Sequence, residues 1–357
     1  MIETLQGCRI IFIFLIFMSH FTWTDTEEFC FGGDCGVSFF FMLSGFVLCH
    51  AHGKEVTENR FNQKRFLFRQ LSKIYPLHIA TLLATILIGV KAGILPDIGN
   101  LALNITLLQS WIPKPETHFA FNGVSWFLSD IMFFYLMFPL LVRCITKATI
   151  LNLSYGIAAV AAAYACIQVI IPEQQVNSLL YVSPILRIID FAIGIILYRL
   201  YVSDFTRTVI RKMKSYGKFR SGIIGCAVII MMIGIYAVYQ ITPQRWRCTS
   251  LFWLPMPIFI YVMAVSNETG GLIADILKSK TVLWLSRLTM EIFMIHKIVI
   301  DIVKNILMKI GIDVGYTLTC LICVAITIGA AYMTERYFVR YTSLYLKRKY
   351  LSYEQNN

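Results

Sequence analysis

Two ionisable side chains in the first apolar stretch of the sequence have types and a spacing that suit acid–base chemistry inside a membrane. Arg9 and His20 are separated by ten uncharged residues in the stretch RIIFIFLIFMSHFTW. A helix that rises about 1.5 Å per residue places them roughly 16 Å apart, half of a hydrocarbon core of about 30 Å. Because ionisable residues are costly at that depth, they indicate a functional site. We expect His20 to be a general base, and an interhelical structural histidine is the alternative.

A second set of polar residues recurs at helical spacing in the later stretch NGVSWFLSDIMFFY. Its members are Asn122, Ser125, Trp126, Ser129 and Asp130. They share one helix face, which should point into the bundle or into a water-filled cavity. The Asp130 carboxyl needs a partner there, and His20 and Arg187 are the candidates. For Trp126, an aromatic anchor at the membrane interface is the alternative.

Two further apolar stretches carry ionisable residues. Arg187 and Asp190 are three residues apart in RIIDFAIG, so they could bind substrate or simply pair with each other. Glu291 and His296 lie in the apolar stretch MEIFMIH. A small-residue pair in the second apolar segment, Ser44 and Gly45, predicts a close contact between helices (residues 44–45).

A basic stretch mixed with aromatic residues, RFNQKRFLFRQLSKIYP, follows the second apolar segment. It contains Arg65, Arg69 and Lys73, whose side chains suit the phosphates of a cytoplasmic molecule. The alternative is a cytoplasmic loop that only attracts anionic lipids.

The elements that must position these residues are membrane-spanning helices. The chain of 357 residues is 57% hydrophobic and 15% charged, well below the charge of soluble proteins. We therefore expect an all-α, polytopic membrane protein with about ten spans. The predicted spans lie near residues 8–24, 35–51, 74–94, 123–145, 150–171, 179–201, 221–240, 249–266, 282–304 and 314–334.

The charges between these segments alternate in a way that predicts the orientation. Every second loop is basic, so both termini should be cytoplasmic, although Arg245 and Arg247 go against the pattern. The net charge of +12 is attributed to this bias, and no nucleic-acid motif is present. We expect one transmembrane domain over residues 1–340 and a basic cytoplasmic tail over 341–357.

Three shorter features complete the prediction. Residues 99–112 are too short and too polar to span, so an interfacial or re-entrant helix is expected. Cys30 and Cys35 share a loop in which a disulfide can form if the loop is extracytoplasmic. Cys320 and Cys323 have no second ligand pair nearby, so we expect packing roles for them and no metal site.

These stretches together resemble the membrane acyltransferase-3 family of bacterial O-acyltransferases over residues 6–340. The arginine and histidine of the first span match Arg9 and His20, and NGVSWFLSDIMFFYLMFP resembles the family's Trp-Ser-Leu-x-Glu motif. GVSFFFMLSGF, FRQLSKIYPL, RIIDFAIG and EIFMIH resemble the remaining motifs. The chain departs from the family at several positions. The family often has an acid at Ser38, Glu at Asp130 and a second arginine at Lys73.

The resemblance implies transfer of an acyl group, usually acetyl, from cytoplasmic acetyl-CoA to a hydroxyl of an extracytoplasmic glycan. The location implied is the bacterial plasma membrane, where lipids surround the helices. Arg9, Arg65, Arg69 and Lys73 would hold the phosphates of coenzyme A. His20 would take the proton of the acceptor, or first take the acyl group itself, and Asp130 would orient it.

The resemblance also implies roles for the other polar residues. Asn122, Ser125 or Ser129 would donate to the developing oxyanion, and Trp126, Arg187, Asp190 and His296 would help to bind substrate. The rival function is a non-enzymatic transporter or flippase for glycan or lipid intermediates. That reading explains the spans and the basic loops, but it gives no reason for the pairing of Arg9 with His20.

Overall fold

The computed structural model describes residues 2–21 and 31–356, and these residues form helices joined by short connections, with no strand among them. This confirms the all-α prediction. Cys30 and Trp23 lie outside the described residues, so the possible disulfide between Cys30 and Cys35 stays a prediction. The first eight α-helices are α1 (Glu3–His20), α2 (Phe31–Thr57), α3 (Gln63–Lys91), α4 (Ile98–Ile105), α5 (Pro115–His118), α6 (Trp126–Lys147), α7 (Ile150–Ile170) and α8 (Pro184–Tyr201).

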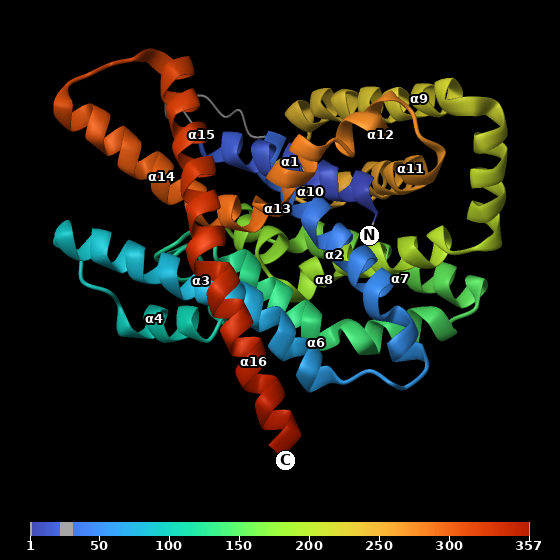
Figure 1. Ribbon diagram of the computed structural model, residues 1–357, viewed down its shortest axis with the longest axis horizontal. Coiled ribbons are helices and arrows are strands. Elements are labelled where there is room, and N and C mark those ends of the chain that lie inside the picture. The colour runs from blue at the N-terminus through green and yellow to red at the C-terminus, as the bar shows by residue number, and fades with distance from the viewer. Residues whose placement is uncertain (1, 22–30, 357) are drawn as a thin grey trace.

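The second half of the chain contains eight further α-helices, of which α9 is the longest (Figure 1). They are α9 (Asp204–Ile241), α10 (Gln244–Arg247), α11 (Pro255–Thr269), α12 (Leu272–Leu277), α13 (Lys280–Arg287), α14 (Thr289–Ile310), α15 (Gly315–Thr334) and α16 (Arg340–Asn356). Short 3₁₀ or π turns separate some of them: η1 (Gln109–Trp111), η2 (Glu173–Gln175), η3 (Asn177–Tyr181), η4 (Ser250–Phe252) and η5 (Glu335–Val339).

Within the described residues, eight helices are long and apolar enough to cross a membrane. A ninth span results if Glu173–Tyr181 and Pro184–Tyr201, which meet at 47°, count as one. The protein is thus a multi-pass membrane protein, and nine of the predicted segments have a counterpart. The remaining segment, 282–304, is divided between α13 and α14, where charges such as Glu291 and Lys297 lower the hydropathy of α14.

The centre of the bundle depends on glycines that let helices touch backbone to backbone. A Cβ at Gly45 of α2 would lie 2.0 Å from the Phe191 carbonyl oxygen, and one at Gly194 of α8 would lie 1.9 Å from that of Met42. A Cβ at Gly32 would lie 1.6 Å from the Leu15 carbonyl oxygen of α1. The close contact predicted at residues 44–45 is therefore present, and α1, α2 and α8 form one tightly packed group.

Aromatic side chains fill the space between this group and α6. The rings of Phe41 and Phe127 stack with centroids 4.6 Å apart, and Phe41 also meets Phe134 edge-on at 4.9 Å. Phe134 in turn lies 5.3 Å from the ring of Phe191 on α8. These rings are buried, and they fix the rotation of α6 against α2 and α8.

Helix α9 turns a corner at Gly217, whose backbone angles are φ 79° and ψ 168° (Figure 1). Positive φ is costly for residues that carry a Cβ, so glycine suits this position. The arm before the corner is almost entirely exposed and mixes cations with the apolar side chains of Phe205 and Tyr216. The apolar arm after the corner packs against α11 and α12.

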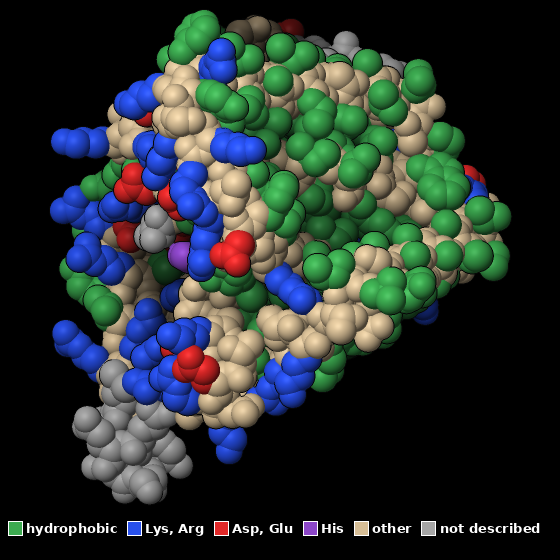
Figure 2. Space-filling view, turned by 90° about the vertical axis from the view of Figure 1, so that its right-hand side faces the viewer, with side chains coloured by type: hydrophobic (Ala, Val, Ile, Leu, Met, Phe, Trp, Pro, Cys, Tyr) green, Lys and Arg blue, Asp and Glu red, His purple; other side chains and the backbone are tan. Residues whose placement is uncertain are grey.

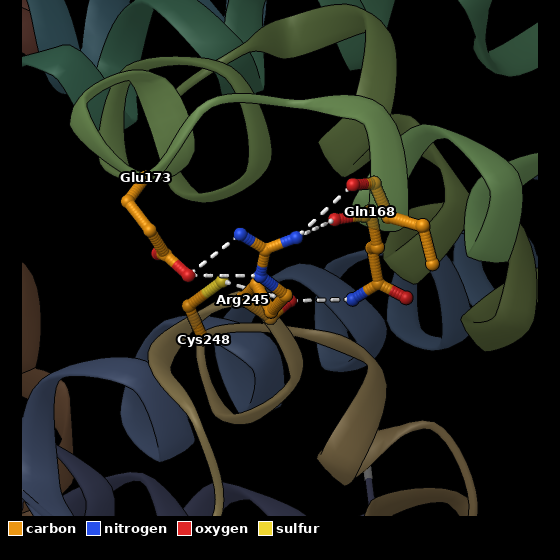
Figure 3. A network of polar contacts seen from close by, with 5 residues as sticks. Gln168, Glu173, Arg245 and Cys248 are labelled. Carbon is orange, nitrogen blue, oxygen red and sulfur yellow. Dashed lines mark hydrogen bonds and ion pairs between the residues drawn. The ribbon is translucent and has the colours of Figure 1, made fainter.

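One of the cations that opposes the charge pattern, Arg245, ties two connections together (Figure 3). Its Nε and Nη2 donate to Oε1 of Glu173 at 3.0 and 2.6 Å. Its Nη1 donates to the carbonyl oxygens of Gln168 and Val169 at 3.0 and 3.1 Å, in the last turn of α7. A cation at a helix C-terminus interacts favourably with the helix dipole, so Arg245 has a structural reason for its position.

The glycine contacts lead to a first prediction. Gly194→Ala should destabilise the protein by about 1–3 kcal/mol, because its new methyl group would overlap the Met42 carbonyl. The measurement is thermal unfolding of the purified protein in detergent. Gly156→Ala on α7 is the matched control, since a Cβ there meets nothing within 4 Å and alanine favours the helix. Equal losses in both variants would show that the α2–α8 contact is not tight.

Candidate active site

A second histidine, His296, lies beside His20. The imidazole rings of His20 on α1 and His296 on α14 have centroids 5.1 Å apart and are tilted by 46°. His296 is fully buried, whereas His20 keeps part of its surface accessible at the last residue of α1. The charge of Lys297 also acts on His20. The structure therefore brings two of the predicted site residues together and leaves His20 as the accessible member.

The hydrogen bonds of His296 fix its tautomer. Its Nδ1 lies 3.1 and 2.8 Å from the carbonyl oxygens of Ile292 and Phe293, which only accept. Nδ1 must therefore carry the proton, so the neutral ring presents Nε2 as an acceptor. Within the described residues, Nε2 is buried and has no hydrogen-bond partner. The ring is held in one orientation with an unused acceptor.

Asn122 joins the same end of the bundle. Its Nδ2 donates to the Met294 carbonyl oxygen of α14 at 2.9 Å, and its buried Oδ1 has no partner among the described residues. One of the two N–H groups on Nδ2 remains for another acceptor. Asn122 is thus fixed to the helix that carries His296.

Arg9 lies on α1 within the protein, well away from the histidines. Its Nη1 donates to the Gln6 side chain at 3.3 Å, and the carboxyl of Glu291 and the phenol of Tyr135 are near enough to interact with it. Glu291, on α14, is buried and its Oε2 has no hydrogen-bond partner in the described chain. Arg9 therefore faces α14 and α6 part of the way along α1, and does not contact His20.

Arg187 and Asp190 form a buried ionic pair on α8, which confirms the pairing that their spacing allows. Arg187 Nη2 lies 3.0 Å from Asp190 Oδ2, and both side chains are at most 1% exposed. Nη2 also donates to Ser38 Oγ at 3.2 Å, and Nη1 donates to the Cys248 carbonyl oxygen at 3.3 Å. Trp253 Nε1 donates to Asp190 Oδ1 at 2.6 Å. An acid at position 38 would face the same guanidinium.

Asp130 is fully buried on α6, and the Ser110 hydroxyl is near enough to act on its carboxyl. Of the two partners considered from the sequence, the charge of Arg187 acts on Asp130. No contact joins Asp130 to His20 among the described residues. The orienting role of Asp130 towards His20 therefore stays a prediction.

The two serines of the same helix face are engaged by the connection between α3 and α6. Ser110 Oγ donates to Ser129 Oγ at 2.6 Å, and Ser129 Oγ donates to the Leu107 carbonyl oxygen at 2.6 Å. Gln109 Nε2 donates to Ser125 Oγ at 3.3 Å, and that hydroxyl donates to Asn104 at 3.3 Å. The polar residues of 99–112, which fold into α4 and η1, thus bind the first turn of α6.

Aromatic side chains lie beside the two histidines and beside the Arg187–Asp190 pair. Trp126 is buried, and its ring lies 5.0 Å from that of Tyr181, so it is not an exposed membrane anchor. Tyr181 lies in turn 5.7 Å below the guanidinium carbon of Arg187. A Cβ built at Gly33 would be 3.5 Å from Tyr181 Oη and 3.2 Å from Ser19 Oγ, next to His20. Tyr181 thus lies between the histidines and the ionic pair.

The predicted phosphate ligands gather around one pocket of about 490 Å³. Its lining includes Arg65, Arg69 and Lys73. The other lining residues are His52, Glu55, Arg60, Phe61, Asn62, Phe66, Gln70 and Lys347. Lys and Arg side chains gather along the left edge of Figure 2, while hydrophobic side chains cover most of the remaining face.

Arg60 is fixed at the rim of this pocket by a neighbouring carboxylate. Its Nε donates to Glu58 Oε2 at 3.0 Å, and its Nη2 also contacts that oxygen. The hydrogen bond to Glu58 raises the pKa of Arg60 and the same contact lowers the pKa of Glu58. Both groups are therefore charged at neutral pH, and Arg60 remains a cation of the pocket.

Sequence reasoning missed several partners of the site. Tyr181 and Trp253 come from segments with no chemical pattern of their own, and Lys347 lies in the stretch predicted only as a basic tail. For Tyr181, the only signal is its place shortly before Pro184, where the chain bends. The polarity of Asn104, Gln109 and Ser110 could have indicated their contact with α6, because amides and hydroxyls that are buried in an apolar segment need polar partners.

Comparison with known proteins gives a consistent result. A family model described as an acyltransferase domain matches residues 2–336. The chain is 27% identical over 309 residues to Acyltransferase MdmB of Streptomyces mycarofaciens, covering 80% of this chain and 72% of that protein. It is 31% identical over 105 residues to Protein 2 in picA locus of Rhizobium radiobacter, covering 26% of this chain and 54% of that protein. No solved structure matches the chain.

The buried ionic pair yields the second prediction. Arg187→Met should destabilise the protein by about 3–5 kcal/mol, because Asp190 would be left as an unpaired buried charge. The double variant Arg187→Met with Asp190→Leu should lose less, as both charges are removed. Thermal unfolding in detergent measures the difference.

The matched control is Arg207→Met at the surface. Arg207 pairs with Asp204 at the same spacing and the same 3.0 Å distance, but the two side chains are 68% and 93% exposed. Its loss should stay below about 1 kcal/mol. Similar losses for Arg187→Met and Arg207→Met would contradict a dominant role of burial.

Proposed function

We propose, from the premise that the chain belongs to the acyltransferase family whose model matches residues 2–336, that it moves an acetyl group from acetyl-CoA to a hydroxyl of an extracytoplasmic glycan. The membrane acyltransferase assignment rests on the family match and on the similarity to Acyltransferase MdmB. The acetyl donor, the glycan acceptor and the bacterial plasma membrane belong to the proposal.

The observation that carries the proposal is the placement of two different sites at opposite ends of α2. The end near Gly33 borders Ser19, next to the accessible His20, while His52 near the other end lines the basic pocket. His52 follows Gly33 by nineteen positions, which corresponds to roughly 28 Å of helix, close to the thickness of a hydrocarbon core. A reaction that takes its donor from one face of the membrane and its acceptor from the other requires two sites separated by about this thickness.

His20 acts as the general base in the proposed reaction. It takes the proton of the acceptor hydroxyl as the oxygen attacks the thioester carbonyl carbon. The carbon–sulfur bond then breaks, and the proton on His20 passes to the leaving thiolate, so that the imidazole returns to its neutral form. The accessible surface of His20 at the end of α1 suits this role.

Two further residues assist this step. They are His296 on α14 and Asn122, which lies shortly before α6. The fixed ring of His296 presents its Nε2 acceptor, which suits a hydrogen bond with the protonated His20 or with an acceptor hydroxyl. Asn122 has one N–H left to donate to the oxyanion, whereas the hydroxyls of Ser125 and Ser129 donate inside the protein.

The basic pocket holds the nucleotide end of the donor. The guanidinium groups of Arg65 and Arg69 suit phosphate oxygens through paired hydrogen bonds, and Lys73 supplies a point charge. Phe61 and Phe66 line the same pocket, and aromatic side chains suit contact with the base. Arg9 on α1 does not line this pocket and supplies a further cation that attracts the phosphates of the donor.

His20→Ala should reduce acetyl transfer by at least about 100-fold, because removal of a general base costs 10²–10⁴-fold. The measurement is release of coenzyme A from acetyl-CoA by the purified protein with a surface-glycan extract. His50→Ala on α2 is the control, since His50 is exposed and should leave the rate unchanged. Transfer by folded His20→Ala within tenfold of the wild type would exclude the base role.

Charge reversal in the pocket tests the donor. Arg69→Glu should raise the KM for acetyl-CoA by about 10–100-fold with a smaller change in kcat, since a charged hydrogen bond is replaced by repulsion. Lys64→Glu on the same helix is the control, because Lys64 is exposed and does not line the pocket. Equal KM values in both variants would place the donor elsewhere.

A further inference from the structure

The C-terminal helix α16 contributes a cation to the basic pocket. Lys347 lines the pocket together with four cations from residues 60–73. The charges of Lys347 and Arg69 both act on Lys73, so the three side chains are close together. Residues between 52 and 73 form most of the pocket, and Lys347 of α16, near the C-terminus, forms another side of it.

Packing against α3 fixes the position of this wall. The rings of Phe68 on α3 and Tyr350 on α16 stack with centroids 4.1 Å apart and planes 17° apart. Ser343, one turn before Lys347, is buried at 7% exposure. The helix thus presents Lys347 to the pocket from a packed position.

The charges of the pocket do not balance without a ligand. Five cations line it against one carboxylate, Glu55, and Glu58 at the rim offsets one of them, Arg60. Within the described residues, no carboxylate forms an ion pair with Arg69, Lys73 or Lys347. Like charges at this separation repel one another, so an anion with several charges would relieve the repulsion. The nucleotide end of coenzyme A, with about four negative charges on its phosphates at neutral pH, has the matching charge.

Helix α16 begins beyond the residues that the family model matches. The family match ends at residue 336, whereas α16 begins at Arg340. The packing of α16 against α3 thus adds Lys347 to a pocket whose other cations lie within the matched residues.

We propose that α16 is part of the donor site and that Lys347 contacts a phosphate of coenzyme A and so sets the affinity for the donor. This inference rests on the proposed function, because it takes coenzyme A as the ligand of the pocket. Lys347 is a binding residue in this account and takes no part in the chemical step at His20.

The test is the Kd for coenzyme A, measured by isothermal titration calorimetry on the full-length protein in detergent. Lys347→Ala should raise the Kd about tenfold, which corresponds to the loss of one charged hydrogen bond. Lys347→Arg should restore most of the affinity. Arg348→Ala is the matched control, since Arg348 is the next residue of α16, is exposed and does not line the pocket.

A second variant separates the charge from its position. Phe68→Ala keeps Lys347 but removes the ring that holds α16, so it should also weaken binding. The double variant Phe68→Ala with Lys347→Ala should be no weaker than Lys347→Ala alone, because both changes act through the same contact. In turnover assays, Lys347→Ala should raise the KM for acetyl-CoA and leave kcat unchanged.

The outcomes distinguish this inference from the proposed function. If the wild type binds coenzyme A and Lys347→Ala binds it equally well, α16 is not part of the donor site, while the proposed function stands. If the wild type binds no coenzyme A, the proposed function fails and the inference fails with it. Equal losses in Lys347→Ala and Arg348→Ala would indicate a general surface charge effect and would also overturn the inference.

Discussion

Backbone contact between α1, α2 and α8 is the constraint on which the rest of the structure depends. Gly32, Gly45 and Gly194 allow carbonyl oxygens of the facing helices to occupy the space of a side chain. His20 is on α1, Ser38 on α2 and Arg187 on α8, so each polar centre is built on a helix of this group. In a membrane, apolar side chains provide little driving force for helix association, and close van der Waals contact must replace it.

That tight group also makes a buried ionic pair tolerable. Arg187 is fully buried, and a lone guanidinium would be very costly there. Its charge is offset by Asp190, by the Ser38 hydroxyl and by a backbone carbonyl, and its carbon lies 5.0 Å from the ring of Phe41. These contacts come from three separate parts of the chain. The pair of Arg187 and Asp190 therefore favours the one arrangement of helices in which all these contacts form together.

Much of this could be predicted from the sequence, because the signals were local. Apolar segments gave nine of the spans, the spacing of Arg187 and Asp190 allowed their pairing, and residues 60–76 contained most of the pocket's cations. What could not be predicted depends on how distant helices rotate against each other. The meeting of His20 with His296, the place of Tyr181 and the approach of α16 to α3 follow from packing, which one sequence does not encode in any local pattern.

The corner at Gly217 also bears on how the chain enters the membrane during its synthesis. A straight helix of 38 residues would extend about 57 Å, nearly twice the hydrocarbon thickness. Its first turns carry Arg207, Arg211, Lys212 and Lys214, and each would resist transfer into lipid by about 2.5–3.5 kcal/mol. Because Gly217 turns the chain shortly before the apolar stretch, these four cations lie off the axis of the span that follows. The depth at which the following span begins is then set by a single backbone angle.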